Sequence, residues 1–127
     1  MKIQMMYSKI HRATVTNADL TYEGSVSIDK NLIAKANLLI NQKVDILNCH
    51  NGARFSTYVI EGKKGEVCLN GAAARHVQKG DTVIIVAYAS MDMAKAKTFE
   101  PTVVFVDSKN GFKEIRKEIQ KGKKTKN

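Results

Sequence analysis

The residues with the clearest chemical potential in this chain stand together in Tyr22-Glu23-Gly24-Ser25. A serine hydroxyl can attack the peptide carbonyl before it when a strained loop holds the hydroxyl on the carbonyl face. The Gly24 peptide would then become an ester on Ser25. Elimination across Cα–Cβ of Ser25 would cut the chain and leave dehydroalanine, and hydrolysis would leave a pyruvoyl group, which is a reactive ketone. Glycine suits the acyl position because it has no Cβ to block the attack.

The same pair has a plainer interpretation as a turn. Glycine reaches positive φ without a steric penalty, and serine hydrogen-bonds to nearby backbone. An isolated Gly-Ser pair favours the turn, so the rest of the chain must decide between the two.

Two further segments carry functional groups at short spacing. Arg54-Phe55-Ser56-Thr57-Tyr58 holds a guanidinium, hydroxyls and a phenol within one stretch of strand-forming residues. On a strand, Arg54, Ser56 and Tyr58 project to one face. Asn70-Gly71-Ala72-Ala73-Ala74 has small side chains that let a ligand approach the backbone amides. Taken singly, these residues are typical of a surface strand, a core tyrosine and a tight turn.

Other common sites are not indicated. The sequence has no G-x-S-x-G elbow, P-loop, G-x-G-x-x-G or H-E-x-x-H motif. Its three histidines, His11, His50 and His76, are scattered, so we expect no metal.

The totals indicate one domain outside the membrane. A chain of 127 residues with 43% hydrophobic residues forms one ordinary globular core. It has no apolar run long enough to span a bilayer and no signal-peptide pattern at Met1, so we expect a cytoplasmic protein. Cys49 and Cys68 form no C-x-x-C pair, which favours buried free thiols, although the spacing leaves a disulfide open.

The net charge of +9 raises the question of a nucleic-acid partner. Residues 113–127 hold seven basic and two acidic residues and thus supply +5 of that charge. Such a terminal run is usually solvated, and no aromatic residues are interleaved with it to stack on bases. We therefore expect no nucleic-acid partner, and keep a basic β-barrel that binds polyanions as the alternative function.

Short strands separated by regular turns position these groups. The patterns predict a small closed β-barrel with a few short helices, forming one domain over residues 1–112, followed by a flexible basic tail over 113–127. Strands are expected at 5–15, 25–28, 43–48, 54–60, 66–69, 82–88 and 102–106. Short helices are expected after Asp29 and at 72–75 and 91–97, with turns at 51–52, 62–65 and 110–111.

Taken in order, the motifs are similar to those of the pyruvoyl-dependent aspartate decarboxylases, which make β-alanine for pantothenate synthesis. The similarity runs from about Met5 to Pro101 and rests on Lys9-Ile10-His11-Arg12, Ala18-Asp19-Leu20, Tyr22-Glu23-Gly24-Ser25, the segment 51–58 and the segment 70–74. The resemblance implies a double-psi β-barrel, a homotetramer with active sites between subunits, and self-cleavage between Gly24 and Ser25 into chains 1–24 and 25–127.

The resemblance also implies roles for single residues. Ser25 becomes the covalent pyruvoyl group, which forms a Schiff base with the amine of L-aspartate, and Tyr58 is the proton donor after CO₂ leaves. Thr57 binds substrate and assists the self-cleavage. Arg54 and Lys9 hold substrate carboxylates. The backbone of Gly71, Ala72 and Ala73 lines the substrate, while the surroundings of the pyruvoyl group are Asn70, Tyr22 and His11.

Charge limits what Arg54 can do. The departing carboxylate loses its charge, so a tight clamp on it would stabilise the ground state more than the transition state. We therefore expect Arg54 to hold the retained side-chain carboxylate of aspartate. The sequence leaves two further matters open: an unprocessed, inactive proenzyme, and a maturation factor that assists the cleavage.

Overall fold

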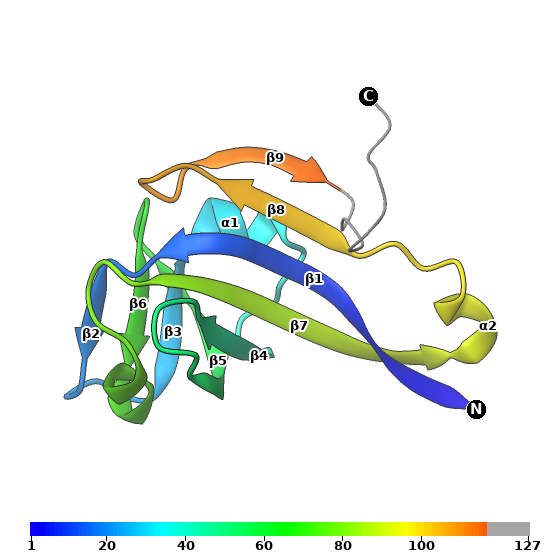
Figure 1. The fold of residues 1–127 in the computed structure, drawn as a ribbon, viewed down its shortest axis with the longest axis horizontal. Coiled ribbons are helices and arrows are strands. Elements are labelled where there is room, and N and C mark those ends of the chain that lie inside the picture. The colour runs from blue at the N-terminus through cyan, green and yellow to red at the C-terminus, as the bar shows by residue number, and fades with distance from the viewer. Residues whose placement is uncertain (117–127) are drawn as a thin grey trace.

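The computed structural model describes residues 1–116, which form nine strands and three short helices (Figure 1). The mainly β class predicted from the sequence is therefore confirmed. The elements are β1 (Lys2–Thr14), β2 (Asn17–Asp19), β3 (Ser25–Asp29), α1 (Lys30–Lys35), β4 (Lys43–Asn48), β5 (Arg54–Gly62), β6 (Val67–Asn70), the 3-10 helix η1 (Gly71–His76), β7 (Thr82–Asp92), α2 (Met93–Ala96), β8 (Thr102–Val106) and β9 (Phe112–Arg116).

The strands form one sheet in the order β2-β6-β3-β5-β4-β7-β1-β8-β9. Hydrogen bonds do not close this sheet, because no ladder joins its two outer strands among the described residues. The continuous chain links its two sides instead. Only Val15 and Thr16 separate β1 from β2. Over these two residues the chain changes its pairing partner, because β1 pairs with β7 and β2 pairs with β6. The amide of Val15 donates to the carbonyl of Asp81 at 2.8 Å, and that of Thr16 to Val67 at 2.8 Å.

The core fills the inside of this curved sheet. The alternation predicted for β4 is present, with Val44, Ile46 and Asn48 buried between more exposed neighbours. β3 and β6 are buried along their whole length, so both faces of each are covered. Removing these aliphatic side chains from water stabilises the fold by roughly 25 cal/mol per Å² of apolar surface. The two strands that carry Ser25 and Asn70 are therefore held in the most protected part of the sheet.

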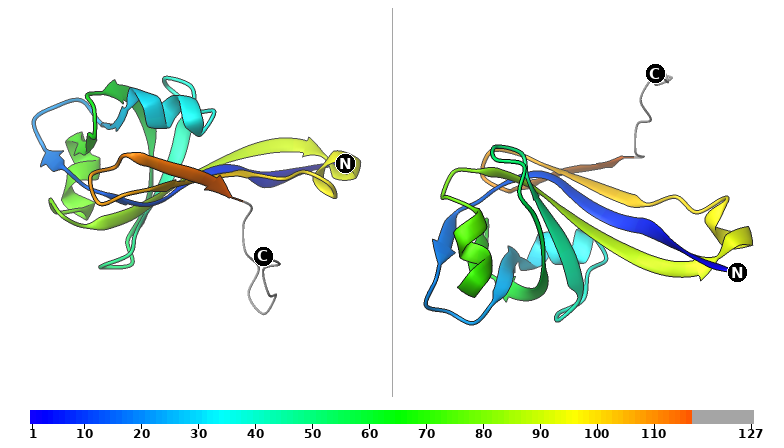
Figure 2. Two further views of the ribbon diagram at one scale, coloured as in Figure 1. Left: turned by 90° about the horizontal axis from the view of Figure 1, so that it is seen from above. Right: turned by 60° about the horizontal axis from the view of Figure 1, so that its bottom comes forward.

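β1 and β7 pair as long antiparallel strands and extend as an arm away from the rest of the sheet (Figure 1 and Figure 2). The short helix α2 lies at the tip of this arm, where the amide of Met93 donates to the carbonyl of Met1 at 3.0 Å. Both strands are longer than the sequence pattern predicted. Lys9 and His11 lie farther along β1, where this strand also pairs with β8 and where β7 pairs with β4.

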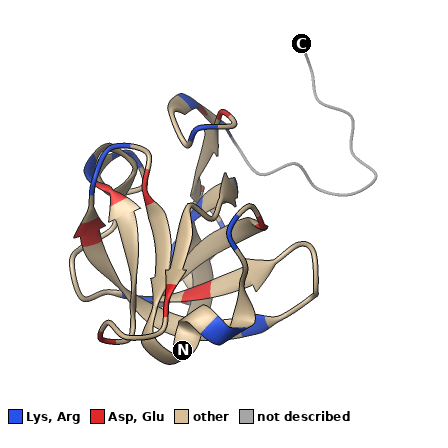
Figure 3. Ribbon diagram, turned by 90° about the vertical axis from the view of Figure 1, so that its left-hand side faces the viewer, with Lys and Arg blue, Asp and Glu red and all other residues tan. Residues whose placement is uncertain are grey.

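Residues 113–116 of the expected tail pair with β8 as part of β9, and the remaining tail, 117–127, lies outside the described residues. In the view of Figure 3, Lys and Arg segments are scattered among Asp and Glu segments of the described residues. Both cysteines are free thiols, but Cys49 is exposed because it lies in the turn after β4, whereas Cys68 is buried as expected. No helix among residues 1–116 is long and apolar enough to cross a membrane.

Asn110 joins three parts of the chain that are far apart in sequence. It lies in the β8–β9 turn at a φ of 61° and is 1% exposed. Its Oδ1 accepts from the amide of Thr14 at 2.8 Å, and its Nδ2 donates to the carbonyls of Thr14 at 2.8 Å and Gly65 at 2.9 Å. The predicted turn at Asn110-Gly111 thus also fastens the end of β1 to the β5–β6 turn.

We expect Asn110→Ala to lower the free energy of unfolding by about 2–4 kcal/mol, because it leaves buried backbone groups without partners at a position of positive φ. Asn37→Ala is the matched control. Asn37 has a φ of 56° but is exposed, so it should lose only about 1 kcal/mol from backbone strain. Urea denaturation measures both, and equal losses would contradict the role assigned to the Asn110 side chain.

Candidate active site

The pairing of β3 with β6 brings Ser25 directly opposite Asn70. Both are buried, at 1% and 3% exposed. Nδ2 of Asn70 donates to Oγ of Ser25 at 2.9 Å, and Oγ of Ser25 donates to the carbonyl of Glu23 at 3.1 Å. The hydroxyl that the sequence singled out is therefore buried, fixed by two hydrogen bonds, and adjacent to the Gly24 carbonyl.

Gly71 lets the start of η1 pack tightly against the loop before Ser25. Its φ is 64°, and a Cβ at this position would lie 2.7 Å from both N and Cα of Gly24 and 3.0 Å from the carbonyl oxygen of Tyr22. No other residue type fits there without moving the backbone. Gly24 itself is open, since a Cβ there would meet nothing within 4 Å. Apart from its chain neighbours, Gly24 thus has free space beside its Cα.

A pocket of about 300 Å³ opens onto Gly24. β5 and η1 provide its walls, and it gathers residues from all three segments identified in the sequence. Its lining comprises Gly24, Phe55, Ser56, Thr57, Tyr58, Ala72, Ala73 and His76. Five of these are predicted site residues, whereas Phe55, Ser56 and His76 were not assigned to the site. Tyr58 is 36% exposed, so its phenol can be reached from the pocket.

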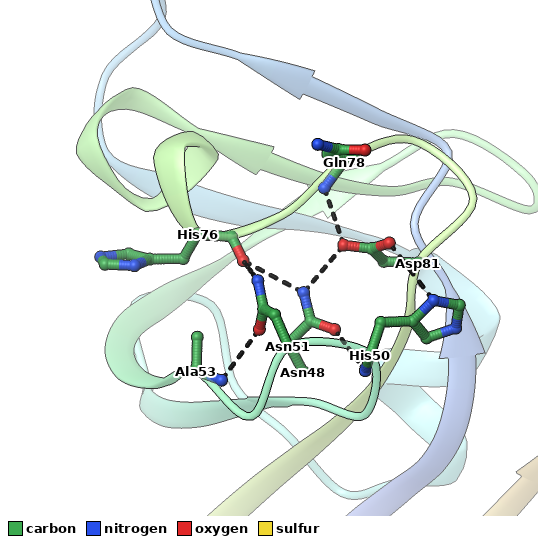
Figure 4. Close-up of polar contacts among 7 residues, drawn as sticks. All are labelled: Asn48, His50, Asn51, Ala53, His76, Gln78 and Asp81. Atoms are coloured by element: carbon green, nitrogen blue, oxygen red, sulfur yellow. Dashed lines mark hydrogen bonds and ion pairs between the residues drawn. The ribbon is translucent and has the colours of Figure 1, made fainter.

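His76 is the pocket residue that the sequence analysis missed. Its ring stacks on Phe55 with centroids 4.7 Å apart. Its carbonyl accepts from Nδ2 of Asn48 at 3.0 Å and Nδ2 of Asn51 at 3.2 Å. Figure 4 shows the imidazole directed away from this amide network. Nothing in the local sequence pairs His76 with Phe55, because β5 and η1 meet only in the folded chain.

Asp81 anchors the same network at the start of β7 (Figure 4). Its Oδ2 accepts from Nδ2 of Asn48 at 2.8 Å and from the amide of Gln78 at 2.9 Å, and its Oδ1 lies 3.7 Å from Nδ1 of His50. The hydrogen bond from Asn48 is the main cause that lowers the pKa of Asp81, followed by that from Gln78. These contacts fix the end of η1 and, with it, one wall of the pocket.

Seven of the twelve predicted site residues are absent from this lining. Ser25, Asn70 and Gly71 lie close to one another and to Gly24, whereas Arg54, Lys9, His11 and Tyr22 lie outside that group. Arg54 is exposed at the start of β5, opposite Leu47. Lys9 and His11 lie on β1, where they pair with Val103 and Phe105 of β8, and the His11 ring is 5.1 Å from that of Phe105. Tyr22 is 56% exposed in the loop before Gly24. Within one chain, the residues expected to bind carboxylates are therefore not part of this pocket lining.

A larger cavity of about 1080 Å³ lies elsewhere, between α1 and the turns before β6 and β9. It contains no predicted site residue. Its two carboxylates, Asp29 and Asp107, already accept backbone hydrogen bonds, from Gly65 and Gly111 among others. Among residues 1–116, no three His, Cys, Asp or Glu side chains gather as a metal site would require. The smaller pocket beside Ser25 is therefore the candidate active site.

Gly71→Ala should destabilise the fold by about 2–4 kcal/mol, because the added Cβ meets the Gly24 backbone and the left-handed φ is unfavourable for alanine. Gly52→Ala provides the control. Gly52 has a φ of 76° but open space around it, so only the backbone penalty of about 1 kcal/mol applies. Urea midpoints measure the difference. Similar midpoints for the two variants would mean that η1 does not depend on close contact with Gly24.

Comparison with known proteins shows the family of this chain. Residues 1–113 match the family model for aspartate decarboxylase. The aspartate 1-decarboxylase of Bdellovibrio bacteriovorus is 65% identical over 124 residues, which cover 98% of this chain and all of that protein. Those of Campylobacter curvus and Aliarcobacter butzleri are 64% and 53% identical, over 87% and 97% of this chain and 96% and 98% of those proteins. The chain belongs to the aspartate decarboxylase family.

Proposed function

We propose that this protein cuts itself between Gly24 and Ser25 and then decarboxylates L-aspartate to β-alanine and CO₂, which serves pantothenate synthesis. The observation that supports this most directly is the buried Ser25 hydroxyl, which Asn70 holds beside Gly24 at the end of a pocket lined by Thr57 and Tyr58. Family membership supports the substrate and the reaction.

In the self-cleavage, Oγ of Ser25 bonds to the Gly24 carbonyl carbon while the peptide C–N bond breaks, and the hydroxyl proton ends on the released nitrogen. Loss of the Ser25 Cα proton then expels the Gly24 carboxylate from Cβ and leaves dehydroalanine. Tautomerisation and addition of water release ammonia and leave the ketone. Thr57, which lines the pocket beside Gly24, stabilises the charge that develops on the carbonyl oxygen.

The position of the cut suits a chain that must stay folded. Gly24 ends a loop and Ser25 begins β3, so cleavage breaks no ladder. The fragment 1–24 stays attached through the pairing of β1 with β7 and of β2 with β6. The fragment 25–127 keeps β3 between β5 and β6. Both products therefore remain in one fold without the covalent bond.

The surroundings of Ser25 fit a pyruvoyl group. A Cβ built at Gly24 would meet no residue within 4 Å apart from its chain neighbours, so there is free space beside Gly24, and Asn70 provides an amide donor beside the position of Oγ. Such a group supplies an electrophilic ketone that binds the substrate amine and accepts the electrons released with CO₂. Around it, Tyr58 supplies the proton to the substrate carbon, and the backbone of Gly71, Ala72 and Ala73 lines the substrate.

Arg54 and Lys9 are proposed to act across a subunit boundary. Neither lines the pocket of its own chain, and a homotetramer with active sites between subunits would supply them from a neighbouring copy. Arg54 would then hold the retained carboxylate of aspartate, for the charge reason given above. His11 and Tyr22 would complete the surroundings of the pyruvoyl group. A cytoplasmic location is part of the same proposal.

Denatured intact mass of purified protein tests the self-cleavage. We expect two chains, 1–24 and 25–127, the second lighter by one ammonia than the product of simple hydrolysis. Ser25→Ala should remain a single chain because it has no nucleophile. A wild-type chain that stays intact after prolonged warming, and binds polyanions in a salt-dependent way, would favour the alternative of a basic binding module.

Tyr58→Phe and Arg54→Lys should affect different kinetic constants, kcat in the first variant and KM in the second. Tyr58→Phe should still cleave itself but lose about 100-fold or more in kcat, because the proton donor is gone. Arg54→Lys should also cleave itself and should mainly raise KM for aspartate, because lysine lacks the planar fork. Measuring CO₂ and β-alanine from aspartate tests both. Wild-type kcat in Tyr58→Phe, or unchanged KM in Arg54→Lys, would remove the corresponding role.

A further inference from the structure

Four buried polar side chains share one face where β3 and β6 pair. Ser25 lies opposite Asn70, and Ser27 lies opposite Cys68, so the four occupy neighbouring positions of one antiparallel ladder. They are between 1% and 8% exposed. The alternate residues of the same strands, such as Val26 and Leu69, belong to the apolar core. We call Ser25, Ser27, Cys68 and Asn70 the β3–β6 polar cluster.

The Asn70 amide is the centre of this cluster, and each of its polar atoms has a partner. Nδ2 donates to Oγ of Ser25 at 2.9 Å and to Oγ of Ser27 at 3.0 Å. Oδ1 accepts from Sγ of Cys68 at 3.3 Å. A rotation of the amide by half a turn would exchange its oxygen and nitrogen. In the observed orientation the Cys68 thiol donates to the oxygen and the Ser27 hydroxyl accepts from the nitrogen, and this nitrogen also faces Ser25.

Asn70 makes these contacts in place of a hydrogen bond that would cap η1. It occupies the N-cap position of η1, where asparagine commonly accepts a hydrogen bond from the helix backbone. Its side chain makes no such bond and turns inward to the cluster instead. The local sequence would assign Asn70 to capping, so its observed direction depends on the partners that β3 and β6 provide.

Cys68 can act as a donor only while its thiol keeps its proton. Burial is the main cause that raises the pKa of Cys68, and the negative charges of Glu66 and Asp19 raise it further. The thiol is thus protonated at neutral pH. An S–H group is a weak donor, so its contribution is to orient the Asn70 oxygen rather than to stabilise the fold strongly.

We propose that Cys68 and Ser27 are positioning residues for the self-cleavage, because they lock the Asn70 amide that holds the Ser25 hydroxyl. This inference rests on the proposed function. With Asn70 fixed, one lone pair of Ser25 Oγ receives the amide proton, while its own hydrogen is directed to Glu23. When Asn70 is released, Oγ samples other directions, and fewer of them lead to attack on the Gly24 carbonyl.

The test is a pulse of cell-free translation of the full chain, followed over time by denatured intact mass of the uncut chain and its two fragments. Cys68→Ala should slow the cleavage by about tenfold or more, because it removes the donor to Oδ1 of Asn70. Ser27→Ala should slow it as well. Cys68→Ser should restore most of the rate, because a hydroxyl donates to the same oxygen.

Two controls separate positioning from general destabilisation. Val67→Ala removes buried volume from the opposite face of β6 and should lower stability without slowing the cleavage. Cys49→Ala removes the exposed thiol and should change neither. Wild-type rates in Cys68→Ala and Ser27→Ala would overturn the proposal. So would a Cys68→Ala defect that Val67→Ala reproduces or that serine does not rescue. A wild-type chain that never cleaves would overturn the proposed function, and this inference with it.

Discussion

The hydrogen bond from Asn70 to Ser25 across β3 and β6 is the contact on which the candidate site depends. It exists because β3 lies between β5, to which it is parallel, and β6, to which it is antiparallel. That arrangement places Ser25 beside Asn70 and also brings the β5 segment with Thr57 and Tyr58 to the same end of the fold. One strand order therefore assembles three segments that lie apart in the chain, at residues 22–25, 54–58 and 70–74.

Burying this polar contact requires that every group in it has a partner, because an unsatisfied polar group in the interior costs roughly 1–3 kcal/mol. The cluster meets that requirement through Ser27 and Cys68. The close packing of Gly71 against Gly24 keeps the loop near Ser25 in place. On the far side of η1, the amides of Asn48 and Asn51 and the carboxylate of Asp81 fix the carbonyl of His76 and the turn after it. The Ser25 hydroxyl is thus held by Asn70, and η1, which packs against the loop before Ser25, is held at its far end by these contacts.

The pocket beside Ser25 has groups suited to bond breaking and proton transfer, but within one chain it lacks the cations that a dicarboxylate substrate calls for. Arg54 is exposed at the start of β5, and Lys9 lies on β1 where that strand pairs with both β7 and β8. Neither residue lines the pocket of its own chain. In the proposed homotetramer, a neighbouring subunit would bring these cations to the pocket, so the active site would be complete only in the assembled protein. The proposed cut at the boundary between a loop and β3 is compatible with the same assembly, because both fragments would keep their ladders.

The sequence by itself determined the β-rich class, most strand positions, the turns at 51–52 and 110–111, and the family motifs, because strand alternation and turn chemistry are local properties. It also singled out Ser25, Thr57, Tyr58, Asn70 and Gly71. Only the tertiary structure decided that hydrogen bonds leave the sheet open and that β9 includes residues 113–116. It likewise placed His76 in the pocket and turned Asn70 inward instead of capping η1. These outcomes depend on which strands pair although they are distant in sequence, and a local sequence pattern does not contain that information.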